Sequence, residues 1–173
     1  IFQEPMTALN PVFRIGAQVD EVIALHNPTW TKEQVKKHTI SMLELVGIAN
    51  SEGVYKMYPH ELSGGQLQRV CIARAVACKP EIILFDEAIS SLDAHTQVQV
   101  MDLLRELKDR LGLTYIFITH DLTSITYLCD DVLFLYQGRV TENLPVERIS
   151  ETKDEYARKL LESIVVFDTE ESA

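Results

Sequence analysis

The sequence predicts an α/β protein with a parallel-sheet core and a helical subdomain. Two features of the hydrophobic pattern favour this class. Across residues 17–78, apolar side chains recur mostly at helical spacing, whereas residues 82–85 form a short continuous apolar run. A predicted helix follows this run and leads to a second strand at residues 114–119. Strands that alternate with helices are typical of a parallel sheet covered on both sides, so we expect both strands to be buried on both faces.

The helical subdomain is predicted element by element. Residues 1–16 are expected to form a loop, because turn formers recur in them and Gly16 closes the segment. A first helix follows until Asn27-Pro28 stops it. A second helix is predicted to begin at a Thr31–Gln34 capping box and to end at Gly47, with residues 48–62 irregular. The expected apolar face of this second helix consists of Val35, Ile40, Met42, Leu43 and Val46.

The second half of the chain has its own sequence of predicted elements. A helix over residues 96–111 ends at Gly112, and its inward side chains are expected to be Val100, Leu103, Leu104 and Leu107. The elements expected after the second strand are a helix at 122–129, a hairpin of 132–136 with 139–141 that turns at Gln137-Gly138, and a helix at 153–164 ahead of an acidic tail.

Composition narrows the class of function. The net charge of −10 weighs against a nucleic-acid partner, since phosphate backbones require basic surfaces. It does not exclude a nucleotide, which backbone N–H groups at a helix start can hold. The three cysteines show no disulfide pattern and fit a reducing cytoplasm, and the five histidines lack the spacing of a zinc site. No apolar run is long enough to predict a membrane span.

The stretch Ser63-Gly64-Gly65-Gln66 lies at the predicted start of an apolar helix. Two glycines let the backbone come close to an anion, and the first-turn N–H groups give the helix start a partial positive charge. Alternatively, Ser63 and Gln66 form a capping box that needs no ligand. The two interpretations use overlapping geometry and remain open together.

Two adjacent carboxylates, Asp86 and Glu87, follow the first predicted strand directly. The carboxyl ends of parallel strands open into the crevice where α/β proteins bind ligands. A solvated acidic turn is the alternative, but four apolar strand residues just before the pair favour a functional site.

Three further positions have an ordinary structural interpretation when taken alone. Ser91-Leu92-Asp93 can supply the N-cap of the next helix, and a single His120 at a strand end is more often structural. Gln3 is unremarkable without context. Their order along the chain is what gives these three positions a functional meaning.

In that order, the motifs resemble those of ATP-binding cassette (ABC) ATPases, which have a P-loop NTPase fold. Gln3 corresponds to the Q-loop, Ser63–Gln66 to the signature, Asp86-Glu87 to Walker B, Ser91–Asp93 to the D-loop and His120 to the H-loop. The resemblance implies that ATP and Mg²⁺ are bound and that ATP is sandwiched at a dimer interface.

The resemblance also implies a role for each residue. It implies catalytic roles for Glu87, as the general base, and for His120, as a γ-phosphate contact; metal binding by Asp86 and Gln3; and nucleotide or interface contacts by Gln3, Ser63, Gly64, Gly65, Gln66 and Asp93.

Residues 3–11 and 154–161 are similar to the peptide and nickel importer branch of the family. This branch implies an ATPase that energises uptake of peptides, nickel or a related metal or metallophore. Its expected partners are a second ATPase subunit, identical or not, transmembrane permease subunits and, indirectly, a solute-binding protein. The expected location is the cytoplasm, peripheral on the inner face of the cell membrane. Ala88-Ile89 departs from the family's usual Pro-Thr, and absence of a C-terminal cysteine cluster leans toward a metal or metallophore cargo.

No Gly-x-x-x-x-Gly-Lys-Ser/Thr phosphate loop (Walker A) occurs in the sequence. We therefore expect a C-terminal fragment that begins at the Q-loop and is inactive alone. The expected segments are 1–16, Q-loop and linker; 17–78, helical subdomain; 79–144, RecA-like core; and 145–173, C-terminal helix and acidic tail. The alternatives are a soluble non-transport ABC ATPase and a non-catalytic permease-binding fragment.

Overall fold

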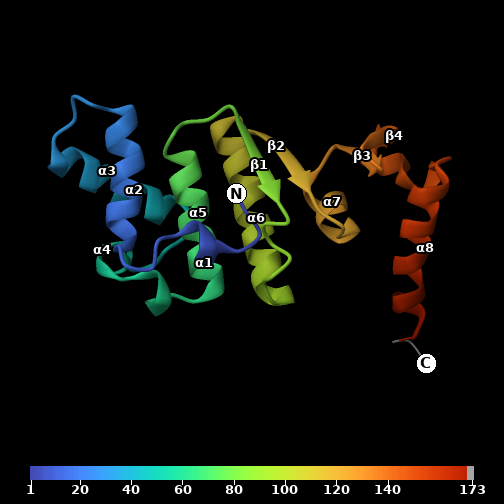
Figure 1. Cartoon of the computed structure of the whole chain (residues 1–173), viewed down its shortest axis with the longest axis horizontal. Helices are drawn as coiled ribbons and strands as arrows, with labels where there is room; N and C mark the ends of the chain where they lie inside the picture. The colour runs from blue at the N-terminus through green and yellow to red at the C-terminus, as the bar shows by residue number, and fades with distance from the viewer. Residues whose placement is uncertain (171–173) are drawn as a thin grey trace. The chain divides into compact units, whose positions relative to one another are not determined.

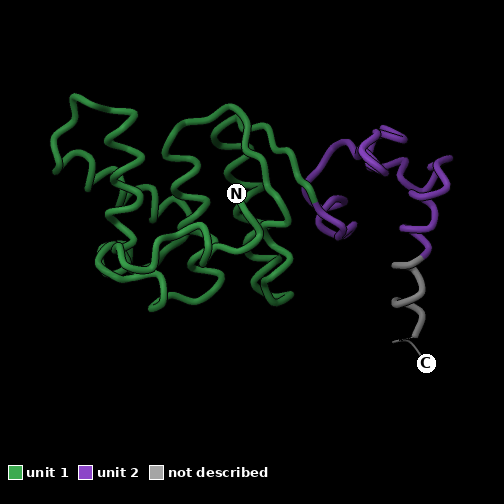
Figure 2. The backbone as a smooth tube through the Cα atoms, viewed as in Figure 1, with its two compact units in different colours: residues 1–118 green, residues 119–173 purple. Residues whose placement is uncertain are grey.

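The computed structural model describes residues 1–170, with side chains through Glu162. The chain separates into two compact units, residues 1–118 and residues 119–173 (Figure 2). This division differs from the four expected segments, which remain a prediction about domain organisation. Each unit is described by itself below.

The first part of unit 1 is helical (Figure 1). Its elements are α1 (Pro5–Ala8), α2 (Ile15–His26), α3 (Lys32–Leu45), α4 (Ser51–Lys56), the 3-10 helix η1 (Pro59–Glu61) and α5 (Gly64–Val76). Helix α2 packs against α3, α4 and α5. The fully buried side chains of this lobe include Ile15, Val19, Ile23, Leu43, Val46, Val70 and Ile72.

The sequence-based boundaries need two corrections in this lobe. The expected loop over residues 1–16 contains α1, which has Pro5 in its first turn, and α2 begins at Ile15. Gly16 therefore lies inside a helix. It packs under Tyr55, and a Cβ added there would come within 2.4 Å of the ring. Close packing explains this glycine, which sequence analysis interpreted as a turn residue.

The expected irregular stretch 48–62 contains α4 and η1. The Asn50 side chain caps α4 by accepting a hydrogen bond from the Gly53 N–H at 3.1 Å. A helix of six residues is too short to show a clear apolar period. The prediction that residues 48–62 are irregular is wrong, because α4 and η1 lie within them.

A carboxylate joins three helices of the lobe. Asp20 of α2 accepts hydrogen bonds from the Thr39 hydroxyl of α3 and the Tyr55 hydroxyl of α4, both at 2.5 Å. Burial, followed by the hydrogen bond to Asp20, raises the pKa of Tyr55 to about 12. These bonds fix α2, α3 and α4 relative to one another, and α5 packs against α2 and α3.

The second part of unit 1 contains the parallel sheet. Strand β1 (Ile82–Asp86) pairs in parallel with β2 (Thr114–Ile118), and α6 (Ala94–Leu111) connects them. As predicted, α6 buries Val100, Leu103, Leu104 and Leu107 and ends at Gly112, which has a left-handed φ of 64°. On the other edge of β1, Ile1 donates its N–H to the Leu84 carbonyl and accepts from the Asp86 N–H.

The expectation that both strands are buried on both faces is wrong for the described chain. Ile83 and Phe85 are buried, and Phe85 stacks on Phe117 on the face that contacts α6 through Tyr115 and the Leu104 carbonyl. The opposite face exposes the apolar side chains of Ile82, Leu84, Ile116 and Ile118. An apolar run reflects what a strand can bury, and it does not reveal whether an element lies over each face.

Unit 2 begins with α7 (Leu122–Leu128) and continues with β3 (Asp131–Tyr136), β4 (Arg139–Pro145), the 3-10 helix η2 (Val146–Glu151) and α8 (Glu155–Glu170). Strands β3 and β4 are antiparallel and turn at Gln137-Gly138, where both residues have positive φ. The predicted hairpin is therefore confirmed. In the described chain β3 pairs with β4 alone, and the parallel sheet consists of β1 and β2.

A small core holds unit 2 together. Val132, Phe134 and Ala157 are buried in it, so α8 packs on the hairpin. The Glu142 carboxylate accepts hydrogen bonds from the Thr152 hydroxyl and from the N–H groups of Lys153 and Asp154, and these bonds hold its pKa below the usual range. Helix α8 continues to Glu170, past the expected end at residue 164, so the first part of the expected acidic tail is helical; residues 171–173 lie outside the described residues. None of the described helices combines the length and apolar character needed to cross a membrane.

Candidate functional site

The start of α5 lies on the surface of unit 1. Ser63 is the N-cap, and its hydroxyl accepts a hydrogen bond from the Gln66 N–H at 3.3 Å. The Gln66 side chain in turn accepts one from the Ser63 N–H at 3.0 Å. The capping box is thus confirmed. Ser63, Gly64 and Gln66 are exposed, so the cap leaves this helix start accessible to an anion.

The segment that precedes α6 lies directly against this helix start. A Cβ added at Gly65 would come within 2.5 Å of the Thr96 Cγ2 atom, and one added at Gly64 would meet Leu92 Cδ2 at 3.7 Å. A side chain at position 65 would therefore force Thr96 to shift, because α5 and α6 approach closely there. The structure brings the expected signature and D-loop together on one surface of unit 1.

Asp93 caps the second of these two helices. Its carboxylate accepts from the Thr96 N–H at 3.0 Å and from the Thr96 hydroxyl at 2.7 Å. These hydrogen bonds lower the pKa of Asp93, the hydroxyl bond contributing most. The N-cap interpretation of Asp93 is confirmed, and the side chain is exposed beside the start of α5. Two helix starts, each with a partial positive charge, are consequently adjacent.

The two predicted carboxylates stand at the carboxyl end of β1. Asp86 is the last residue of the strand and is exposed, whereas Glu87 is half-buried. The Glu87 N–H donates to the Ile118 carbonyl at 2.8 Å and so ties this end of β1 to the end of β2. Glu87 has a φ of 48°, a left-handed conformation that residues other than glycine rarely adopt. Such conformations cluster at functional sites, where the surrounding structure enforces them.

Gln3 reaches the turn that follows Glu87. Its side-chain amide donates to the Ser90 hydroxyl at 3.4 Å, and its carbonyl accepts from the Ser91 hydroxyl at 3.3 Å. The first residues of unit 1 therefore contact this turn, although about ninety positions separate them in the sequence. Sequence analysis placed Gln3 in the site from its order along the chain, and the hydrogen bonds bring it next to the Glu87 turn.

His120 belongs to unit 2. It is exposed and precedes Asp121, whose carboxylate caps α7 by accepting from the Thr123 and Ser124 N–H groups. The expectation that His120 works together with the residues of unit 1 remains a prediction.

The chemistry of the grouped side chains suits a magnesium–phosphate ligand. Mg²⁺ in nucleotide enzymes is commonly bound by one or two protein oxygens together with phosphate oxygens and water. Asp86 offers one exposed carboxylate at the strand end, and Gln3 an amide close to the same turn. Among the described residues, no cluster of three or more His, Cys, Asp or Glu side chains could hold a metal without such a ligand.

Sequence analysis missed two residues of this site. Thr96 binds the Asp93 carboxylate and packs against position 65, and Ser90 binds both Gln3 and the Glu87 carbonyl. A serine or threonine near a helix start is common in any protein. Only tertiary packing shows which partners these hydroxyls have.

We expect Gly65→Ala to lower the free energy of unfolding by about 1–3 kcal/mol, because its Cβ overlaps the Thr96 methyl group. Chemical denaturation of the 173-residue chain measures this loss. Thr96→Ser removes that methyl group and keeps the hydroxyl that binds Asp93. In the Thr96→Ser background the cost of Gly65→Ala should largely disappear, and an unchanged cost contradicts the proposed contact.

Solved structures resemble this fold. CbiO1 from Clostridium perfringens, described as part of the ABC transporter complex cbiONQ, has a TM-score of 0.74 and 29% identity over 92% of this chain and 61% of its own. The ATP-binding cassette MJ0796, in a dimeric post-hydrolysis state bound to ADP and Pi, has a TM-score of 0.70 and 29% identity over 84% of this chain and 62% of its own. The predicted α/β fold of an ABC ATPase is thereby confirmed.

Sequence relatives point the same way. The oligopeptide transport ATP-binding protein AppD of Bacillus subtilis is 40% identical over 98% of this chain and 52% of its own length. OppD of Escherichia coli, with the same description, is 44% identical over 82% of this chain and 42% of its own length. The chain thus spans about half the length of the curated relatives it matches. Residues 1–90 match the family described as "ABC transporter", and the chain belongs to that family.

Proposed function

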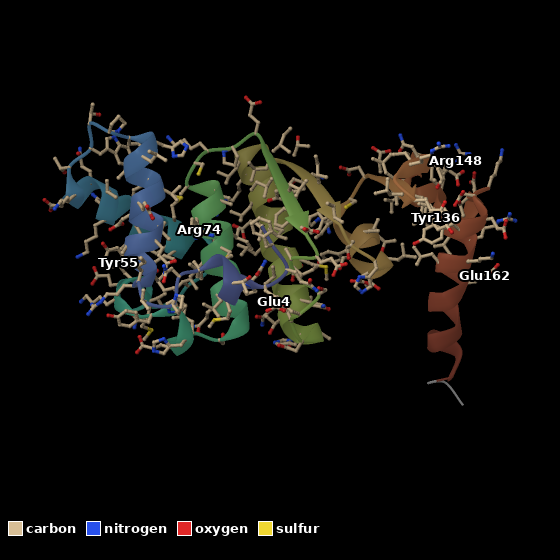
Figure 3. The ribbon with its side chains drawn as sticks, in the orientation of Figure 1. Glu4, Tyr55, Arg74, Tyr136, Arg148 and Glu162 are labelled. Carbon is tan, nitrogen blue, oxygen red and sulfur yellow. The ribbon has the colours of Figure 1, made fainter. Side chains whose placement is uncertain are left out.

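We propose that the protein containing this sequence hydrolyses ATP to drive uptake by an ABC importer. Two observations on unit 1 support this most: the start of α5 lies against the start of α6, and Gln3 binds the turn that follows the carboxylates at the end of β1. Charged phosphates and a divalent cation need such a set of donors and acceptors. Figure 3 draws the side chains of the described residues on the ribbon.

In this proposal the chain's own residues bind and orient the nucleotide. The N–H groups at the start of α5 face the γ-phosphate of an ATP held mainly by a second ATPase subunit. Asp86 and Gln3 would hold Mg²⁺, which would supply positive charge beside the transferred phosphoryl group. Glu87 accepts a proton from the attacking water. His120 contacts the γ-phosphate, and Asp93 lies at the subunit interface.

We further propose a peptide as the cargo. The relatives are described as transporting oligopeptides, dipeptides or glutathione, and the expected nickel or metallophore cargo has weaker support. The remaining partners are transmembrane permease subunits and, indirectly, a solute-binding protein. Association with them places the protein at the inner face of the cell membrane.

Glu87→Gln in the complete protein should lower ATP turnover by roughly 10²–10⁴-fold, because an amide cannot accept the proton of the attacking water. Binding of ATP should persist, since the amide keeps the size of the side chain. Phosphate release and nucleotide affinity are measured in parallel. The exposed Glu33→Gln on α3 is the control and should match the wild type. Hydrolysis at the wild-type rate in Glu87→Gln removes Glu87 from the role of base.

Ser63→Arg should abolish ATP-dependent dimer formation, because a long side chain blocks the exposed start of α5. Light scattering on the Glu87→Gln form of the complete protein, with Mg²⁺ and ATP, measures the dimer. Ser63→Asp separates the phosphate contact from capping: aspartate caps helices as well as serine does, yet it repels a phosphate. We expect normal thermal stability but no dimer. A dimer of normal affinity in both variants leaves capping as the role of Ser63.

The 173-residue chain by itself should neither bind ATP tightly nor hydrolyse it, because its sequence contains no Gly-x-x-x-x-Gly-Lys-Ser/Thr loop. In P-loop ATPases this loop provides most of the triphosphate contacts. Calorimetric titration with Mg²⁺ and ATP tests this. A micromolar dissociation constant contradicts the proposal, whereas saturation only near millimolar ATP agrees with it.

A further inference from the structure

Ser90 connects two parts of the site that the motifs treat separately. Its hydroxyl donates a hydrogen bond to the Glu87 carbonyl at 2.8 Å and accepts one from the Gln3 side-chain amide at 3.4 Å. Its backbone N–H also donates to the Glu87 carbonyl, at 3.1 Å. One short side chain therefore contacts both the backbone that carries Glu87 and the side chain of Gln3.

The backbone at Glu87 needs such support. A φ of 48° is unfavourable for a residue with a Cβ, so the conformation persists only where neighbouring groups enforce it. On the amino side, the Glu87 N–H is bound to the Ile118 carbonyl of β2. On the carboxyl side, both donors of Ser90 bind the Glu87 carbonyl. The peptide groups on both sides of the Glu87 Cα are thus fixed, and with them the direction in which its side chain leaves the backbone.

We infer that Ser90 is a positioning residue for ATP hydrolysis. Its hydroxyl binds the Glu87 carbonyl and the Gln3 amide, and so holds the backbone that carries the Glu87 carboxylate in a fixed relation to Gln3. The inference rests on the proposed function, in which Glu87 is the base. A small displacement of a general base slows the chemical step strongly, because the base no longer lines up with the attacking water. The affinity of the protein for its substrate changes little.

The test compares Ser90→Ala with a matched serine elsewhere in unit 1. The Ser41 hydroxyl also donates to the carbonyl three residues before it, that of His38, at the same distance of 2.8 Å. Ser41 lies on α3, outside the site. Ser90→Ala should lower kcat by roughly 10- to 100-fold in the complete protein and leave the KM for ATP unchanged. Ser41→Ala should keep the wild-type kcat, and both variants should unfold at similar temperatures. Ser90→Thr keeps a hydroxyl and should recover most of the lost kcat.

A double-mutant cycle with Gln3→Ala tests the link to Gln3. If Ser90 holds Gln3 in place, losing both side chains should slow turnover little more than the worse single variant does. Fully additive losses overturn the link. A wild-type kcat in Ser90→Ala, a loss confined to KM, or an equal loss in Ser41→Ala overturns the positioning role. The wild-type protein and Glu87→Gln are assayed in parallel, to distinguish failure of the inference about Ser90 from failure of the proposed function. If Glu87→Gln is inactive while Ser90→Ala is normal, only the inference about Ser90 fails. If Glu87→Gln is active, Glu87 is not the base, and if the wild-type complete protein does not hydrolyse ATP, the proposed function itself fails.

Discussion

The close approach of α5 and α6 is the constraint on which the rest of the site depends. Gly65 lets the start of α5 lie against Thr96, and Thr96 in turn binds the Asp93 carboxylate that caps α6. One contact therefore sets the spacing of two positively polarised helix starts. Helices α2 and α3 of the helical lobe also pack against α5 and so help to fix its position relative to α6.

The carboxyl end of β1 extends this arrangement to the acidic side chains. The pairing of β1 with β2 fixes Asp86 and the Glu87 N–H, and the turn that follows returns the chain to α6. The same turn receives the side chain of Gln3 from the first residues of the sequence. Donors for an anion and acceptors for a cation are thereby held within one compact unit, although they come from three separate stretches of the chain.

The sequence predicted the features that local chemistry determines. The capping boxes at Thr31 and Ser63 and the left-handed Gly112 occur as expected, because each depends on residues only a few positions apart. The hairpin at Gln137-Gly138 does too. Features that depend on tertiary contacts were missed or wrong. The closeness of Gly16 to Tyr55, the partners of Ser90, and the exposed face of β1 each require knowledge of what lies beyond the local segment. Motif order, and not local propensity, led us to expect Gln3 beside the carboxylates; its hydrogen bond to Ser90 puts it next to the Glu87 turn, and its role in binding remains a prediction.

The open face of the β1–β2 sheet has a practical consequence for handling the chain. Ile82, Leu84, Ile116 and Ile118 leave between 46% and 57% of their surface in contact with water. Neighbouring aliphatic groups on a flat sheet are a common cause of self-association. Salts such as sulfate are excluded from protein surfaces and strengthen this tendency. The net charge of −10 opposes self-association, because the negatively charged chains repel one another. Dissolved salt screens this repulsion, so self-association should increase with ionic strength. Dilute buffers of low salt, well above the isoelectric point near 4.9, favour the dispersed state.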